Sequence, residues 1–252
     1  MFRHEGAART YRHNQLLAGY LALIAGFVNS AGFIVIGSFT SHVTGNVGRF
    51  ADDIALGRPA AVLAATMVIA YFAGAFVASM AIESNMLRRR SVYGGLLVIE
   101  GAMLASFALL SLLMNTENAF FHDIQALLLC AAMGLQNSFV TRLSGAVVRT
   151  THLTGVVTDL GIESARWFRL WRAKLRLVVG SASTTVPQAP RTFLLLTILV
   201  TFILGSALGA IAAVSMGALA LLLPTLLLVA GGWFVLRDNR ELDLARSTDG
   251  SV

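Results

Sequence analysis

The sequence predicts an all-α integral membrane protein whose six transmembrane helices form two inverted three-helix repeats. Three observations lead to this fold class. Of the 252 residues, 56% are hydrophobic and only 13% are charged, whereas soluble domains carry about 25% charged residues. The basic residues cluster beside the apolar segments. Two motifs of the first half of the chain recur, in the same order, in the second half.

Six apolar segments are long enough to cross a bilayer, which takes about 20 mainly apolar residues. They are residues 16–37, 61–82, 93–114, 123–143, 193–214 and 217–236. The first run exceeds the roughly 7–15 residues of a signal-peptide core, so we predict that it is a membrane span. The gap between the last two segments is so short that it predicts a tight turn.

The basic residues predict that both termini are cytoplasmic. Of the 19 basic residues, 17 lie in the two terminal tails, between the second and third spans, or between the fourth and fifth spans. Only Arg49 and Arg58 fall on the other side. Cytoplasmic segments are enriched in Arg and Lys, so this distribution explains the net charge of +6 without a nucleic-acid partner.

The internal repeat is the most specific feature of the chain. Gly-Phe-Val-Asn-Ser at 26–30 parallels Gly-Leu-Gln-Asn-Ser at 134–138, an offset of 108 residues. Ser-His-Val-Thr-Gly at 41–45 parallels Thr-His-Leu-Thr-Gly at 151–155, an offset of 110. A weaker echo links the small-residue patterns that begin at Tyr71 and Phe202. Such duplication is typical of transporters and channels.

The two copies are expected to be inverted, because each contains three spans and the second must enter from the opposite side. We therefore predict a single membrane domain over residues 1–252, with repeat one at about 15–114 and repeat two at about 121–237. The two motif segments should approach the centre of the domain from opposite faces. A functional site is expected where the repeats meet.

The Asn-Ser pairs within the first span of each repeat are the first candidate site. They are Asn29, Ser30, Asn137 and Ser138. A buried amide in hydrocarbon must find hydrogen-bond partners. Because glycines flank both pairs, one interpretation is a locally unwound helix that presents polar groups to a solute. The alternative is that Asn and Ser join two helices.

The second motif supplies the candidates His42, Thr44, Asn46, His152 and Thr154. We predict that Ser41 and Thr151 are N-caps of helical stretches at 43–57 and 152–172. A helix start attracts anions or polar oxygens, and a histidine there can donate, accept or titrate. The alternative is that each histidine ties its hairpin to a neighbouring span.

Glu100 is a further candidate, because it is the only carboxylate well inside a predicted span. Intramembrane carboxylates are costly and usually functional. The alternative is a protonated side chain bonded to a neighbouring helix.

Outside the spans, aromatic and basic residues alternate at 157–176, which predicts an amphipathic helix on the anionic inner leaflet. Residues 180–190 are rich in small residues and proline and predict a connector.

Several functions are excluded or disfavoured. The chain has no phosphate-binding loop, no His-Glu-x-x-His zinc motif and no nucleophile elbow. The single cysteine, Cys130, lies in an apolar run and cannot form an internal disulfide. We therefore expect no enzymatic activity, no cofactor and no metal. The expected partners are a small solute or ion and the lipid bilayer, while the oligomeric state stays open.

The segments Gly-Phe-Val-Asn-Ser-Ala-Gly-Phe from residue 26 and Gly-Ser-Phe-Thr-Ser-His-Val-Thr-Gly-Asn from residue 37 resemble the YoaK-type bacterial membrane proteins. The resemblance covers nearly the whole chain, although that family often has Asp at the position of Asn29. It implies a six-span protein of the bacterial inner membrane and no established activity.

Two functions remain in competition. The leading hypothesis is a small-solute transporter or channel whose pathway lies between the repeats and is lined by the polar candidates above. The alternative is a non-transporting scaffold or sensor that acts through the basic helix at 157–176.

Overall fold

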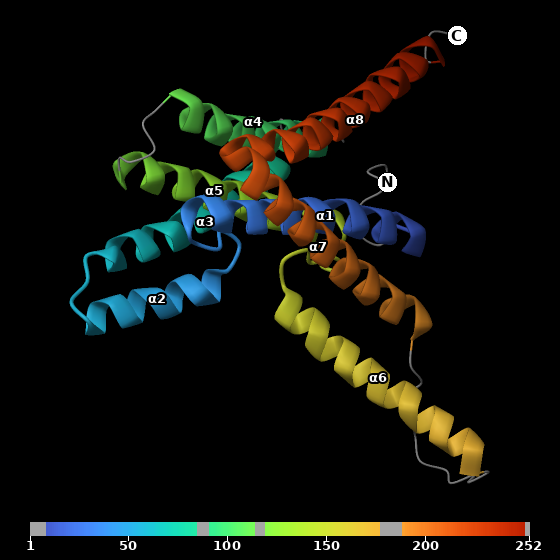
Figure 1. Cartoon of the computed structure of the whole chain (residues 1–252). Coiled ribbons are helices and arrows are strands. Elements are labelled where there is room, and N and C mark those ends of the chain that lie inside the picture. Colours follow the sequence, from blue (N-terminus) through green and yellow to red (C-terminus); the bar gives the residue numbers. More distant parts are fainter. Residues whose placement is uncertain (1–8, 85–90, 114–118, 177–187, 250–252) are drawn as a thin grey trace.

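The computed structural model describes residues 9–84, 91–113, 119–176 and 188–249, and no strand occurs within them (Figure 1). Its helices are α1 (Tyr11–Ile36), α2 (Val43–Ala55), α3 (Ala60–Glu83), α4 (Ser91–Leu113), α5 (Ala119–Leu143), α6 (Leu153–Arg176), α7 (Ala189–Met216), the short 3-10 helix η3 (Gly217–Leu221) and α8 (Leu222–Asp249). The arginines at 88–90 and most of the predicted connector at 180–190 lie outside the described residues.

The apolar helices are those of a multi-pass membrane-type protein. By length and composition alone, five helical stretches of the described chain could cross a membrane. Four correspond to α1, α3, α4 and α5. The fifth, Ala189–Asp238, is 50 residues long and contains α7, η3 and most of α8. The predicted all-α class therefore holds for the described residues, with helix ends within a few residues of the expected ones in the first five segments.

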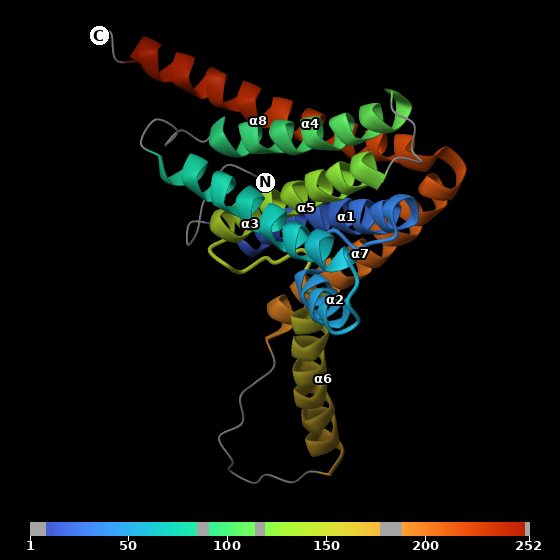
Figure 2. The same ribbon diagram turned by 90° about the vertical axis from the view of Figure 1, so that its left-hand side faces the viewer.

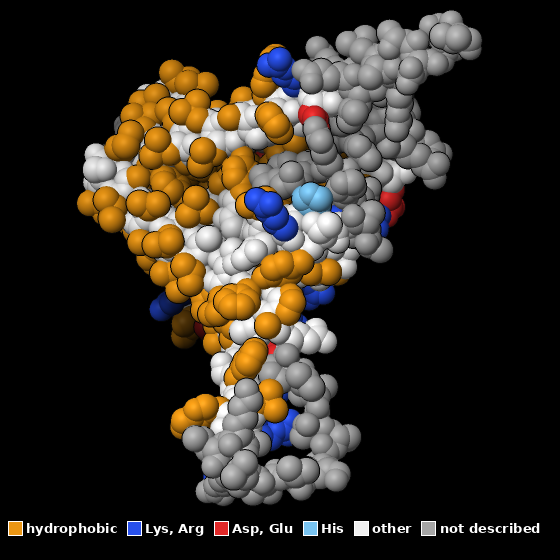
Figure 3. Space-filling view, turned by 90° about the vertical axis from the view of Figure 1, so that its right-hand side faces the viewer, with side chains coloured by type: hydrophobic (Ala, Val, Ile, Leu, Met, Phe, Trp, Pro, Cys, Tyr) orange, Lys and Arg blue, Asp and Glu red, His pale blue; other side chains and the backbone are white. Residues whose placement is uncertain are grey.

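The outer surface of these helices is strongly apolar. Large hydrophobic side chains on α3 and α7 are mostly exposed, including Phe72 at 67% and Val214 at 77%. Figure 3 shows hydrophobic side chains covering one flank of the molecule, with few charged groups among them. Soluble monomers rarely expose apolar patches of this extent, so this surface fits contact with lipid.

The long helices pack in three pairs that are distant in sequence. The most extensive contacts join α1 to α7, α3 to α5 and α4 to α8. In Figure 1 the long helices run roughly alongside one another and reverse direction from each to the next along the chain. The core lies mainly on α1 and α5, where Leu21, Met133 and Phe139 are fully buried. Cys130 is buried in the same core, as predicted.

Glycines bring the paired helices into backbone contact. A methyl group on Gly134 of α5 would overlap the carbonyl oxygen of Tyr71 on α3. At the matching repeat positions, a methyl group on Gly26 of α1 would overlap the carbonyl oxygen of Phe202 on α7. Only glycine permits this separation. The small-residue patterns are thus the packing surfaces that the sequence predicts.

The same contacts correct one expectation. We interpreted the glycines around Asn29 and Asn137 as places where the helix unwinds, but α1 and α5 are continuous helices through both residues. The absent side chain at Gly26 and Gly134 admits a neighbouring carbonyl rather than breaking the helix. Sequence alone does not distinguish these two uses of glycine.

The sixth apolar segment also differs from expectation. It begins with η3 rather than with an α-helix, after Gly217 adopts a positive φ of 58°. Pro224 lies in the first turn of α8, where its missing N–H costs no hydrogen bond. The helix then continues to Asp249.

Candidate functional site

Two loops that fold back along their own helices form the base of the site. α1 ends at Gly37, which has a φ of 71°, and the corresponding Gly145 after α5 has a φ of 63°. Glycine is the usual residue in this left-handed conformation, which turns the chain away from the helix axis. The chain then returns beside the helix that it has just left.

Hydrogen bonds fix the returning loops at equivalent points. The Ser41 hydroxyl donates to Oδ1 of Asn29 at 2.7 Å. The Thr151 hydroxyl donates to Oδ1 of Asn137 at 2.8 Å. Each asparagine lies six or seven residues before the end of its helix, so each loop returns by about 10 Å along the helix axis. The alternative, in which Asn and Ser join two helices, describes the Ser138–Ser79 bond between α5 and α3, whereas each asparagine joins its helix to the loop that follows.

These bonds correct the expectation that Ser41 and Thr151 are N-caps. Their side chains bond to asparagines instead, and α2 and α6 begin two residues later, at Val43 and Leu153. His42 precedes α2 and makes no side-chain capping bond. Its carbonyl accepts from Asn46 N–H at 3.1 Å, and the carbonyl of His152 accepts from Val156 N–H at the same distance.

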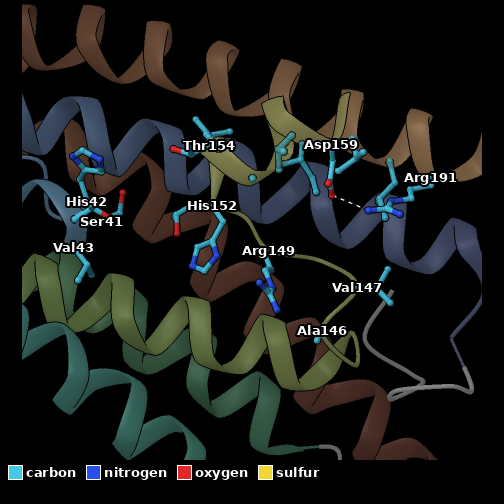
Figure 4. Close-up of a pocket in the computed structure, with 18 of the residues that line it drawn as sticks. Ser41, His42, Val43, Ala146, Val147, Arg149, His152, Thr154, Asp159 and Arg191 are labelled. Carbon is cyan, nitrogen blue, oxygen red and sulfur yellow. Dashed lines mark hydrogen bonds and ion pairs between the residues drawn. The ribbon is translucent and has the colours of Figure 1, made fainter. Parts of the chain in front are cut away.

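A cavity of about 930 Å³ lies where the two short helices begin (Figure 4). It is lined by residues 41–44 at the start of α2, 151–156 at the start of α6, several residues of α7, the loop at 146–149, Tyr11 and Tyr71. Residues from both repeated motif segments thus share one cavity. The sequence predicts that these segments meet, but not that they enclose a space.

The cavity extends from one end of the helix bundle to its middle. Tyr11 is the first residue of α1, whereas Ser41 is bonded to Asn29, 18 residues further along that helix. The two levels are therefore about 27 Å apart. Several lining residues are exposed, among them Val147 after α5 and His42 and His152 before α2 and α6.

The charges around the cavity are few. Asp159 of α6 and Arg191 of α7 form an ion pair at 2.8 Å, which Figure 4 marks with a dashed line. Among the described residues that line the cavity, Arg149 is the one further charged side chain. Burial, and secondarily the positive charge of Arg149, lowers the pKa of His152. The His152 imidazole is therefore neutral at neutral pH.

The two copies of the motif differ in detail at the cavity. A methyl group on Gly45 would overlap the imidazole of His42, which covers the first turn of α2. At the equivalent Gly155 nothing lies within 4 Å of such a methyl group, so this position of α6 borders open space. In addition, α2 packs along α3 more extensively than α6 packs along α7. Figure 2 shows α6 extending away from the bundle.

Four of the predicted site residues line the cavity. They are His42, Thr44, His152 and Thr154. Asn29 and Asn137 lie one hydrogen bond behind it, through Ser41 and Thr151.

The other predicted residues lie elsewhere. Ser138 shares a hydrogen bond of 2.8 Å with Ser79 of α3. Asn46 is buried and donates to the carbonyl of Phe39 at 3.5 Å. Ser30 is partly buried in α1 and does not line the cavity.

Glu100 is also separate from the cavity. It is fully buried in α4, and neither carboxylate oxygen has a hydrogen-bond partner. The adjacent Gly101 packs against Val229 and Thr225 of α8. Glu100 therefore lies at the contact between α4 and α8, and neither helix contributes a described residue to the cavity lining. The second repeat has no carboxylate to match it, as the sequence indicates.

Several cavity residues were not predicted as site residues. Arg149 counts toward topology in the sequence, and Tyr71 begins a small-residue pattern. The Tyr71 side chain interacts with both Thr151 and Asn137 across the α3–α5 contact. One signal was available for Arg149, namely its position two residues before the Thr-His motif. Nothing in the sequence pointed to Asp159 and Arg191 as a pair.

The described residues include no group of three or more His, Cys, Asp or Glu side chains that could hold a metal ion. The donors around the cavity are instead imidazoles, hydroxyls, one free guanidinium and backbone N–H groups. This set can bind a polar solute by hydrogen bonding.

The fold and the cavity together define a helical, multi-pass membrane-type protein with a cavity that both repeated motif segments line. The chain belongs to DUF1275, a family of proteins of unknown function, whose model matches residues 17–233. No curated protein and no solved structure matches the chain significantly. The resemblance to the YoaK-type proteins therefore stays a prediction.

Proposed function

We propose that this protein is a small-solute transporter or channel of the bacterial inner membrane, with its pathway through the cavity. One observation carries the proposal: a single cavity reaches from the end of the bundle to the point where both repeated motifs begin a helix. Both copies of the duplicated polar motif thus contribute side chains to one space. In transporters, such sites lie near the bilayer midplane, where repeats meet.

We further propose that the two halves are inverted repeats. The contacts of the long helices support this, because α1 packs on α7 as α5 packs on α3. In the repeat, α1 corresponds to α5, and α7 corresponds to α3. The α1–α7 pair therefore has the α5–α3 pair as its counterpart. The bonds from Ser41 to Asn29 and from Thr151 to Asn137 exchange in the same way.

Six membrane crossings follow from the length of the last apolar stretch. A straight helix over the 50 residues of Ala189–Asp238 would be about 75 Å long, more than twice the hydrocarbon thickness. The chain instead turns at η3, so α7 and α8 would each cross once. With six crossings and the arginine distribution, both termini and the mouth of the cavity would face the cytoplasm.

The differing packing of α2 and α6 suggests how the pathway alternates. The closely packed α2 would close the outer side, while the looser α6 leaves the inner side open. If α2 packed loosely and α6 packed closely instead, the cavity would open on the outer side and close on the inner side. Such rocking around a fixed central site is the usual behaviour of inverted repeats.

A bulky residue at Gly155 tests the proposal. A Cβ atom placed on Gly155 has nothing within 4 Å, so we expect the side chain of Gly155→Trp to occupy cavity space. We expect purified protein in liposomes to admit at least one of sodium formate, urea, glycerol or glycine, measured as swelling by light scattering, and Gly155→Trp to lose most of that flux. Gly161→Trp is the matched control, since Gly161 also has free space on α6 but does not line the cavity.

Equal flux in the Gly155→Trp and Gly161→Trp proteins, with unchanged melting temperatures, would remove the cavity from the pathway. Flux no greater than that of empty liposomes for every solute would count against transport itself.

A second function has a specific observation in its favour. Trp167, Phe168 and Trp171 are each about half-exposed on α6, and Arg172 lies over the Phe168 ring at 5.9 Å. A scaffold or sensor could use this surface on the inner leaflet. This alternative predicts that the double variant Trp167→Ala/Trp171→Ala loses the scaffold or sensor function, whereas Gly155→Trp retains it.

A further inference from the structure

The charged and polar side chains of the cavity indicate which class of solute it would take. The ion pair of Asp159 and Arg191 contributes no net charge to the cavity. This leaves Arg149, an exposed side chain of the lining with no ion-pair partner among the described residues. An arginine is charged at every physiological pH. The cavity therefore carries a net positive charge from a fixed source.

The neighbouring groups are hydrogen-bond donors. An imidazole N–H and a hydroxyl can each donate a hydrogen bond, and His42, His152 and Thr44 all line the same cavity as Arg149. Figure 4 shows Arg149 and His152 projecting from the same loop region, with His42 at the far end of the cavity. Arg149 is close enough to His152 to affect its charge state.

The N-terminal ends of α2 and α6 also favour an anion over a cation, but they do not define a site by themselves. The residues that begin both helices line the cavity, and the first turn of α6, with its N–H groups, borders open space at Gly155, whereas the His42 imidazole covers the first turn of α2. Such N–H groups carry partial positive charge. A cation in the same space would meet Arg149 and two helix starts, and its only carboxylate neighbour in the described lining is already paired.

We propose that the solute is a small anion, organic or inorganic, held by Arg149 with a donor from the neighbouring His152. This inference rests on the proposed function and narrows it to one charge class. It assigns Arg149, which sequence analysis placed among the topology-determining arginines, to ligand binding. A guanidinium can bind a carboxylate or phosphate through two parallel hydrogen bonds, which a neutral analogue of the same shape does not reproduce.

The test compares three solutes of similar size and different charge: acetate, acetamide and methylammonium, with phosphate as a second anion. Thermal-shift titrations and liposome swelling are carried out on the wild type and on three variants. Arg149→Gln removes the charge, Arg149→Lys keeps it, and Arg169→Gln removes an exposed arginine of α6 that does not line the cavity. All are measured at equal ionic strength, so general salt effects cancel.

We expect acetate or phosphate to raise the melting temperature of the wild type and of Arg169→Gln. The apparent affinity should fall about tenfold or more in Arg149→Gln and recover in part in Arg149→Lys. An anion-induced shift of equal size in Arg149→Gln would overturn the assignment. So would preferential binding or flux of acetamide or methylammonium, which would nevertheless leave a solute pathway in place. Absence of flux for all four solutes, together with no effect of Gly155→Trp, would remove the proposed function itself.

Discussion

At the scale of single residues, the two asparagines of the repeat explain how the motif segments are held. An asparagine inside a helix usually lowers helix stability, because its side chain competes for backbone hydrogen bonds. Here Asn137 donates to the carbonyl of Met133 at 2.8 Å and accepts from the returning loop through Thr151. The side chain thus satisfies its polar atoms in an apolar setting and fixes the start of α6. Asn29 holds Ser41 in the corresponding place.

A double-mutant cycle on Asn29 and Ser41 tests this role. Asn29→Ala leaves the Ser41 hydroxyl without its acceptor, and we expect it to reduce the free energy of unfolding by about 1–3 kcal/mol. Ser41→Ala should cost less, and the double variant should show a coupling energy of about 1 kcal/mol. Unfolding in a mixed-detergent titration measures all three. Additive effects, with a loss of helix content in Ser41→Ala alone, would restore the N-cap interpretation.

The residue types of the site could largely be predicted, but their partners could not. The repeat identifies His42, Thr44, His152 and Thr154, because duplication of a polar motif in apolar sequence is improbable without a role. Arg149 is different: the cavity that it lines is also lined by residues of α2 and α7, which are distant in the sequence. The sequence alone does not distinguish an arginine that lines a cavity from an arginine that determines membrane orientation.

At the scale of helices, glycines decide which surfaces meet. The α1–α7 and α3–α5 pairs each contain reciprocal glycine contacts: Gly205 faces the carbonyl of Leu23, and Gly74 faces that of Ala131. The close approach places the first helix of each half against the second helix of the other half. The sequence predicts close packing from the small-residue spacing, but it does not say that the partners belong to different repeats.

Gly134→Ala tests the close contact. Its methyl group would overlap the Tyr71 carbonyl, which is backbone and cannot move alone. We expect a loss of about 1–3 kcal/mol or more in the free energy of unfolding. The control is Gly95→Ala on α4, where nothing lies within 4 Å of the added methyl group. Greater helix propensity should make this variant neutral or more stable by up to about 1 kcal/mol. Equal stability of the two variants would argue against backbone contact between α3 and α5.

At the scale of the whole molecule, the central feature is one cavity that joins segments from both ends of the bundle. The sequence places His42 after the first span, on the side opposite to the N-terminus. The structure brings its side chain into a cavity that is also lined by Tyr11, at the end of the bundle where α1 begins. The reason is the turn at Gly37, which sends the chain back along α1 to Asn29. Hydropathy gives the end of a span but not the direction of the loop that follows.

Cysteine accessibility tests this arrangement directly. The single native cysteine is buried, so the unmodified protein is the blank. His42→Cys is compared with Leu56→Cys, at an exposed residue after α2, and with Arg169→Cys on α6. Each is treated with a membrane-impermeant thiol reagent in sealed vesicles of the two opposite orientations. We expect His42→Cys to react from the same side as Arg169→Cys and from the side opposite to Leu56→Cys. Reaction of His42→Cys only from the side that labels Leu56→Cys would contradict the cavity, and with it the pathway proposed here.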